Sequence, residues 1–253
     1  MKLHALPAGR LRMREQIFRP EAPREATIDL PVGAFLIRHP QGNAMFDTGC
    51  HPSVIADAEG RWGGLARLMA PIFTEAEALP ASLAATGLGP DDIDLVICSH
   101  LHPDHCGCNG MFHRASLICH AAELDAARAP DAGTKGYVAA DWDQGLAVRP
   151  IAGAHDVFGD GRLTLLPVPG HTPGCLAAHV VLDHDGAFVL AADAASLRDH
   201  LDRDFTPRNT WNHDRARDSL AELRRLRADG ARVICGHDER DWAALRTGAA
   251  FYA

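Results

Sequence analysis

The chain has 253 residues, of which 47% are hydrophobic and 23% are charged, and its formal net charge is -8. This length and composition fit a single domain over residues 1–253 with a sizeable buried core. The negative charge and the lack of a basic stripe argue against a nucleic-acid partner. No stretch has the length of a membrane span, and residues 1–7 lack the apolar core of a secretory signal. The seven cysteines, several of them in predicted strands, favour reduced thiols in the cytoplasm.

In the N-terminal part of the chain, turn residues separate apolar segments. Residues 27–47 predict a β-hairpin, with two strand segments on either side of Gly33 and a turn at residues 41–43. The apolar, glycine-punctuated segment 60–73 lies outside this strand pattern and has two interpretations. It can be a lid over an acyl pocket. It can equally be a helix that packs three apolar side chains into the core: Leu65, Leu68 and Met69.

Residues 80–86 predict a helix that ends at Gly87, and residues 93–98 predict a buried strand. Four side chains that can bind metal follow this strand directly: His100, His102, Asp104 and His105. Imidazole nitrogen and carboxylate oxygen suit zinc and its first-row neighbours, and a catalytic zinc keeps one position open for water. If the strand continues, residues 100 and 102 project to the same side and can share one ion. Isolated histidines are usually surface or satisfied core residues, but this crowding favours a metal site.

Asp104 and His105 lie where the chain turns and can reach a second ion. Four residues cannot fill two ions, so further ligands are expected, and candidates stand at the ends of later apolar runs. His171 lies in a Pro/Gly-rich turn after one run, Asp193 ends the next, and His237 follows the last. Alone, each is more simply explained as a turn or cap residue. The repeated construction, in which a strand delivers one ligand at its end, favours a common site.

The remaining pattern indicates the fold class. Residues 215–228 predict an amphipathic helix closed by Gly230, with leucines on one face and arginines on the other. Apolar strands, flanking helices and ligands at strand ends predict an α/β fold, an αββα sandwich of two mixed β-sheets flanked by helices. We expect the site at the edge of the sandwich, where the loops converge.

The pattern His-x-His-x-Asp-His, followed at wide intervals by His, Asp and His, resembles the metallo-β-lactamase superfamily of dinuclear metal hydrolases. The resemblance runs from Phe46-Asp-Thr-Gly49 to Gly236-His-Asp238. Within the superfamily, the chain most resembles the branch of the N-acyl-homoserine lactonases and 4-pyridoxolactonase. The segments that support this branch are 35–40, 47–50, 105–109, 119–123 and 169–174. The ligand sets that the resemblance implies are His100, His102 and His171 for one metal, Asp104, His105 and His237 for the other, and Asp193 as the bridge. It implies two Zn²⁺ per chain, with Fe, Mn or Co as alternatives.

Residues around the ligands are also candidates. Asp47 can accept the free ring N–H of a ligand histidine, or it can belong to a plain Asp-Thr-Gly turn. The lactonases carry a tyrosine three residues after the bridging aspartate, where its hydroxyl helps to polarise the lactone carbonyl, but this chain has Ser196 there. The loop over residues 202–213 is rich in hydrogen-bonding side chains, and three of them are candidates for substrate contact: Arg208, Asn209 and Trp211.

The site chemistry implies hydrolysis. Two bridged divalent ions lower the pKa of a shared water toward neutrality, and the hydroxide so formed can attack a lactone carbonyl. Asp104 is expected to hold the proton of the nucleophile and pass it to the departing oxygen. We therefore expect a cytoplasmic hydrolase, monomeric or homodimeric, that opens small lactones, foremost N-acyl-homoserine lactones (quorum quenching). The alternatives are another lactone or ester such as 4-pyridoxolactone, a glutathione thioester, a β-lactam, or a metal-binding protein without activity.

Overall fold

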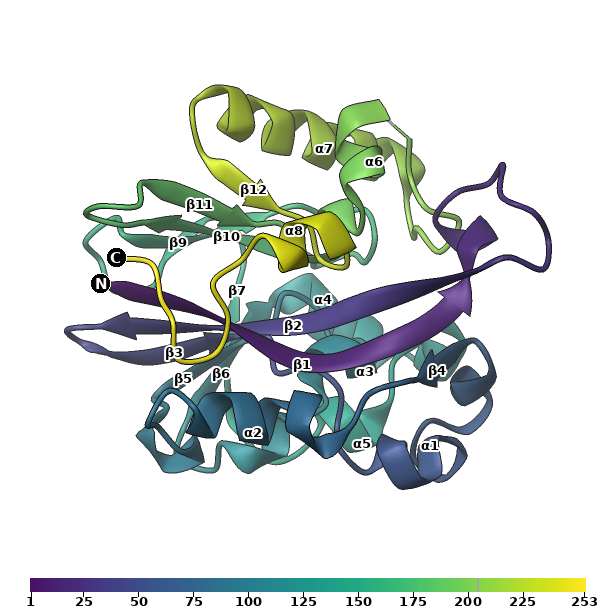
Figure 1. Cartoon of the computed structure of the whole chain (residues 1–253), viewed down its shortest axis with the longest axis horizontal. Helices are drawn as coiled ribbons and strands as arrows, with labels where there is room; N and C mark the ends of the chain where they lie inside the picture. Colours follow the sequence, from purple (N-terminus) through teal and green to yellow (C-terminus); the bar gives the residue numbers. More distant parts are fainter. Residues whose placement is uncertain (204) are drawn as a thin grey trace.

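Two mixed β-sheets lie face to face between two layers of helices in the computed structural model, which describes residues 1–203 and 205–253 (Figure 1). The larger sheet has the strand order β4 (Met69–Pro71), β1 (Lys2–Arg14), β2 (Thr27–His39), β3 (Gly42–Phe46), β5 (Leu95–Ile97), β6 (Ser116–His120) and β7 (Ala147–Ile151). Its first four strands are antiparallel, whereas β3, β5, β6 and β7 run parallel. The predicted αββα sandwich is confirmed.

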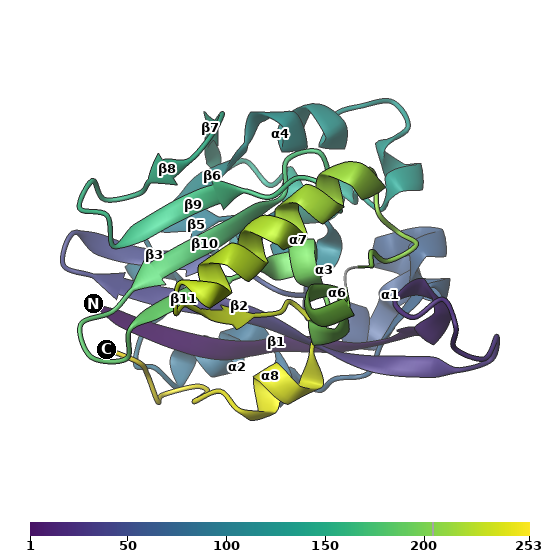
Figure 2. The same ribbon diagram turned by 90° about the horizontal axis from the view of Figure 1, so that it is seen from above.

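The smaller sheet carries the second half of the chain. Its order is β12 (Arg232–Ile234), β11 (Ala187–Leu190), β10 (Leu176–Val181), β9 (Leu163–Pro167) and β8 (His155–Asp156). Only the pair of β11 and β12 is parallel among these strands. The two chain ends meet beside each other, because Leu3 pairs with Tyr252 (Figures 1 and 2).

Helices cover the outer faces of both sheets. On the side of the larger sheet lie α1 (Val54–Trp62), α2 (Leu79–Ala84), α3 (Pro103–Cys106), α4 (Ala121–Ala127) and α5 (Ala139–Trp142). The others are α6 (Arg198–Arg203), α7 (His213–Ala228) and α8 (Glu239–Ala243). Figure 2 shows α7 lying across the smaller sheet. Among residues 1–203 and 205–253, none of these helices combines the length and apolar character that crossing a bilayer requires.

Alternating side chains of the strands divide the apolar core into layers. Phe35 and Ile37 of β2 point into the space between the sheets, whereas Leu36 points to the opposite face and packs toward α2. On the other side of the molecule, Leu220 and Leu223 of α7 pack against the smaller sheet. The predicted amphipathic helix is confirmed, and it begins two residues earlier than expected.

The hairpin over residues 27–47 is confirmed, but the two segments on either side of Gly33 form one strand, and the turn comes one residue earlier than expected. The strand β2 continues through Gly33, and the turn occupies residues 40–41, so Gly42 already begins β3. A Cβ atom at Gly33 would lie 1.7 Å from Cη2 of Trp242, so the glycine makes room for this indole ring rather than a bend. The helix expected at residues 80–86 is present as α2, and Gly87 follows it with φ +80°.

The segment 60–73 is not the continuous helix of one interpretation. It contains the end of α1, a 3-10 turn over Gly63–Arg67 and the short strand β4, which joins the larger sheet. The expectation that it stands outside the strand pattern is therefore wrong. Met69 is buried in an apolar cluster, whereas Leu68 is 57% exposed. Both side chains line the same cavity, so the segment forms a wall of that cavity.

Candidate metal centre

All seven predicted ligands come together at one edge of the sandwich. Their segments follow β5, β9, β11 and β12, so each ligand stands just beyond the end of a strand. The first four residues of the set lie in the turn after β5 and in α3, where Pro103 occupies the start of the helix. His171 lies in the turn between β9 and β10, and Asp193 lies in the 3-10 helix Ala192–Ala195.

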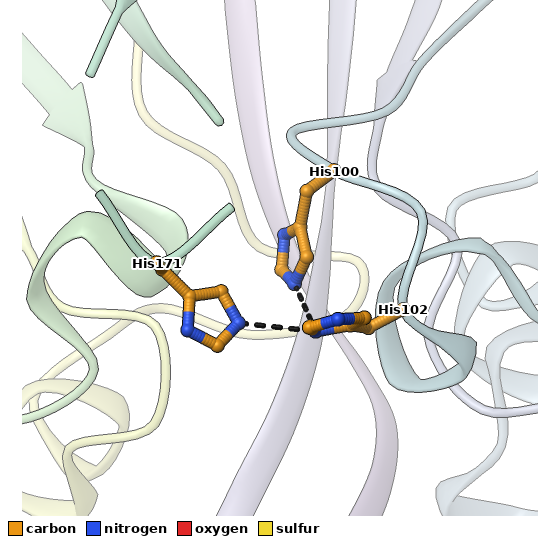
Figure 3. Close-up of side chains that lie close together, drawn as sticks. All are labelled: His100, His102 and His171. Atoms are coloured by element: carbon orange, nitrogen blue, oxygen red, sulfur yellow. Dashed lines mark hydrogen bonds between the residues drawn. The ribbon is translucent and has the colours of Figure 1, made fainter. Parts of the chain in front are cut away.

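Three histidines form the first cluster. Nε2 of His100 lies 3.1 Å from Nδ1 of His102, and Nε2 of His171 lies 3.0 Å from the same Nδ1 atom. Figure 3 shows the three rings directed toward one another, with His100 and His102 on one segment of the chain and His171 on another. His100 and His171 are buried and His102 is partly exposed, so one side of the cluster opens toward solvent.

The second cluster combines Asp104, His105 and His237, whose potential ligand atoms lie within 4.8 Å of one another. Asp193 stands between the two clusters. Its Oδ2 atom lies 3.4 Å from Nε2 of His171, and its Oδ1 atom lies 2.9 Å from Nε2 of His237. One carboxylate thus presents an oxygen to each cluster, which is the geometry that a bridging ligand requires.

Outer contacts turn the rings toward the site. The Nδ1 atom of His105 lies 2.8 Å from Oδ2 of Asp47, and Nδ1 of His237 lies 2.9 Å from the carbonyl oxygen of Pro31. In both rings the Nδ1–H donates outward, so Nε2 is left to face the cluster. Asp47 also accepts the backbone N–H and the hydroxyl of Ser99, at 2.7 and 2.8 Å. The expected contact between Asp47 and a candidate ligand histidine, His105, is therefore present.

Electrostatics differ between the two clusters. Burial lowers the pKa of His171 to about 4, and burial together with neighbouring histidines lowers the pKa of His100 well below its ordinary value. Burial acts against protonation of His105 as well, but the negative charges of Asp104 and Asp47 outweigh it and raise this pKa to about 10. His100 and His171 are therefore held neutral, which is the form of imidazole that binds metal.

The buried atoms at the centre fit a divalent cation. Nε2 of His105 is buried without a hydrogen-bond partner in the described part of the chain. Buried polar atoms of this kind are rare unless a water or an ion satisfies them. A set of imidazole nitrogens and carboxylate oxygens is also the ligand chemistry that zinc and related metals take.

A cavity of about 400 Å³ opens over the site. Five candidate metal ligands form one wall: His102, Asp104, His171, Asp193 and His237. Apolar side chains line another wall, and they come from the hairpin of β1 and β2 and from the segment 60–73: Met13, Ile17, Phe18, Leu30, Leu65, Leu68 and Met69. The cavity therefore joins a polar reactive end to an apolar compartment.

The loop after α6 forms a third wall. Arg208, Asn209 and Trp211 all line the cavity, as their predicted role in substrate contact requires. The backbone N–H of Arg208 donates to the carbonyl of Ile17, and that of Trp211 donates to the carbonyl of His171, so this part of the loop is bonded both to the segment before β2 and to the turn of His171. Asp204, in the same predicted loop, lies outside the described residues.

Ser196 occupies a different environment from the one that a substrate contact would need. Its side chain is fully buried, its Oγ atom has no partner among the described residues, and it does not contribute to the cavity wall. Its carbonyl oxygen instead accepts the backbone N–H of His237 at 2.8 Å. The position thus supports a ligand-bearing turn through its backbone.

Several residues of the site were missed in the sequence. The ring of Tyr137 lies 5.1 Å from that of His102 and lines the cavity, together with Thr172. Phe18 and Leu30 come from a hairpin far from the ligands in the sequence. Thr172 follows a predicted ligand, so its place next to His171 offered a signal. Tyr137, Phe18 and Leu30 offered none, because only the tertiary fold brings them to the site.

Comparison with known proteins gives consistent matches. A model of the metallo-beta-lactamase superfamily matches residues 28–237. The N-acyl homoserine lactonase AttM of Azorhizobium caulinodans is 33% identical over 260 residues, covering 100% of this chain and 98% of the relative. The N-acyl homoserine lactonase AiiB of Agrobacterium fabrum is 30% identical, and 96% of each chain is covered.

Solved structures agree in fold. A Bacillus thuringiensis AiiA variant with N-decanoyl-L-homoserine bound at the active site has a TM-score of 0.88 and 25% identity, covering 99% of this chain and 98% of the other. An N-acyl homoserine lactone hydrolase with its product N-hexanoyl-L-homoserine at the catalytic metal centre has the same values. These matches confirm the resemblance drawn from the ligand motif. The fold and the histidine and aspartate clusters together support binding of divalent metal.

Proposed function

Because the chain belongs to the metallo-β-lactamase superfamily, we propose that it is a dinuclear zinc hydrolase that opens the lactone ring of N-acyl-homoserine lactones. In this proposal His100, His102 and His171 hold one ion, and Asp104, His105 and His237 hold the other. The observation that carries it is the position of Asp193, whose two oxygens face the two clusters separately. A closed structural zinc site needs four ligands and no shared carboxylate, so this arrangement favours a catalytic centre.

Different residues of the chain have different roles in the proposed reaction. When bound, the metals supply an activated water and a Lewis acid for the lactone carbonyl. Asp104 belongs to the second cluster and lines the cavity, so its carboxylate can hold a proton of the nucleophile and deliver it to the oxygen that leaves the ring. The side chains of Asn209 and Trp211 offer N–H donors from the loop wall, and these can orient the substrate carbonyls.

The cavity supports an acyl lactone as substrate. Its apolar wall can bury an acyl chain while the ring lies against the ligands. The relatives AttM and AiiB are named as N-acyl homoserine lactonases. A small lactone of another type is a second candidate substrate for the same reaction. The observation that favours it is Ser196, which does not line the cavity and therefore offers no hydroxyl to the substrate carbonyl.

Some properties of the whole protein belong to the same proposal. We propose that residues 1–253 form a single hydrolase domain, monomeric or homodimeric, that acts in the cytoplasm. The seven cysteines are all buried free thiols, which fits a reducing compartment. The acidic net charge of -8 argues against a nucleic-acid substrate.

A lactone panel assayed by proton release tests the proposal, because ring opening produces an acid. The panel should contain N-acyl-homoserine lactones of several chain lengths, unacylated lactones, a glutathione thioester and a β-lactam. We expect the acylated lactones to be opened fastest, activity to disappear on chelation, and activity to return with Zn²⁺. Hydrolysis that persists in the chelated enzyme, or activity on the thioester alone, would refute the assignment.

A further inference from the structure

Glu123 is a fully buried carboxylate close to the three-histidine cluster that has no place in the reaction described above. It lies in the first turn of α4, on a different element from any candidate ligand. Its Oε1 atom accepts the backbone N–H of Leu101 at 3.1 Å, and its Oε2 atom accepts the backbone N–H of Gly174 at 3.0 Å. Each oxygen therefore holds a different loop.

These two loops carry the three histidines. Leu101 stands between His100 and His102, and Gly174 closes the turn that contains His171. Gly174 also packs tightly on α4, since a Cβ atom there would lie 2.4 Å from the backbone nitrogen of Glu123. A single side chain thus ties together two segments that are some seventy residues apart in the sequence and that must meet for the cluster to form.

The charge of Glu123 is also uncompensated by protein cations. No lysine, arginine or histidine pairs with it in the described part of the chain, and its contacts to the backbone N–H groups of Leu101 and Gly174 and to the Tyr137 phenol are all with neutral groups. Burial and the negative charge of Glu123 raise the pKa of the neighbouring Tyr137 phenol, which stays protonated. A buried carboxylate without a counter-ion destabilises a fold unless a cation lies nearby. A divalent ion among the three histidines would be such a cation.

Asp47 provides a parallel on the other side of the same turn. It accepts the backbone N–H of Ser99, just before His100, while Glu123 accepts that of Leu101, just after it. Asp47 contacts a ligand ring directly, whereas Glu123 contacts only the backbone. The two carboxylates therefore accept hydrogen bonds from the residues on either side of His100. Of the two, only Glu123 also accepts a hydrogen bond from the turn of His171.

We propose that Glu123 is the positioning residue of the three-histidine metal site: by tying the turn of His100 and His102 to the turn of His171, it brings the three rings together and favours the cation they bind. This inference rests on the proposed function for the assignment of these histidines as ligands. It predicts that loss of the carboxylate weakens one of the two metal sites selectively.

The test is zinc affinity, measured on the purified full-length protein by competition with a chromogenic zinc chelator. Glu123→Gln preserves size but removes the charge and one acceptor, and Glu123→Ala removes the tie entirely. We expect one zinc equivalent to bind about 10–100-fold more weakly in Glu123→Gln, as for other groups that orient ligands, while the other equivalent is retained. The matched control is Asp141→Asn, a buried carboxylate that instead accepts from Arg61 and Trp62.

Thermal unfolding with and without zinc separates positioning from a general role in folding. Each variant is compared with its own metal-free form, so a variant that folds poorly still gives a result. We expect zinc to raise the melting temperature less in Glu123→Gln than in the wild type or in Asp141→Asn. Wild-type zinc affinity in Glu123→Gln, or an unchanged zinc-induced rise from a lower starting temperature, would overturn the inference. Lactone opening by the wild type then still stands as a separate test of the proposed function.

Discussion

The carbonyl oxygen of Lys135 lies 3.0 Å from Nε2 of His102, and this contact turns the Nδ1 atom of the ring toward His100 and His171. His102 therefore offers the opposite nitrogen from the other two histidines of its cluster. The carbonyl belongs to a tight turn in which Gly136 has φ +91°, and a Cβ atom at Gly136 would lie 3.2 Å from Nε2 of His102. The loop that holds the ring thus needs a glycine next to it.

Gly136→Ala should accordingly weaken metal binding. The new methyl group meets the ring of His102 and strains the backbone, so we expect zinc affinity and turnover to fall by about tenfold or more. Gly145→Ala is the matched control, since Gly145 has φ +80° but open space around its Cβ position. Chelator competition on both variants gives the comparison, and an equal loss in the two would mean that backbone strain alone is responsible.

Asp104→Asn should lower kcat by on the order of a hundredfold or more, through loss of proton transfer and weaker binding at the second cluster. The substrate KM should change less, because the apolar wall that binds the acyl chain is untouched. Steady-state kinetics with zinc content measured on the same samples checks this. Near-normal turnover in a variant that keeps its full zinc content would show that another group carries the proton.

Ser196→Ala should be nearly silent toward lactones, because the serine is buried away from the cavity. Asn209→Ala and Trp211→Phe should cost more, since both residues line the cavity. Loss of one preorganised donor typically costs about 3 kcal/mol of transition-state stabilisation when nothing replaces it. The measurement is kcat/KM for all three variants on the best lactone. A large loss confined to Ser196→Ala would reverse the assignment of these roles.

The metal-free protein should lose stability as the pH rises from about 7 to about 10. Its folded state holds a proton on His105 more tightly than the unfolded state does, because the pKa is raised from 6.5 to about 10. This stabilisation is fully present below the unfolded-state pKa of 6.5, and it disappears as the pH rises past the folded-state pKa of about 10. Melting temperatures of the chelated protein across this range give the test. The decline should flatten in His105→Asn and in the zinc-loaded protein, where metal replaces the proton.

The sequence carried the information for the ligands but not for their surroundings. The pattern around His100 is local, and each later candidate follows an apolar strand, so these two signals predicted the seven side chains that the structure brings together. The apolar wall comes from Phe18 and Leu30, whose place depends on how the first hairpin packs over the site. The sequence did not show that the segments on either side of Gly33 form one strand, because glycine in a strand can mark a bend or a close contact, and only the position of Trp242 decides between them.

Titration of the chelated enzyme with Zn²⁺, while lactone opening is recorded, tests the dinuclear account most directly. The account predicts that activity depends on the second equivalent and stops rising at about two equivalents per chain. It also predicts that Asp193→Ala, which removes the shared carboxylate, abolishes this dependence together with nearly all activity. Full activity at a single equivalent, or an Asp193→Ala variant with unchanged zinc content and turnover, would contradict it.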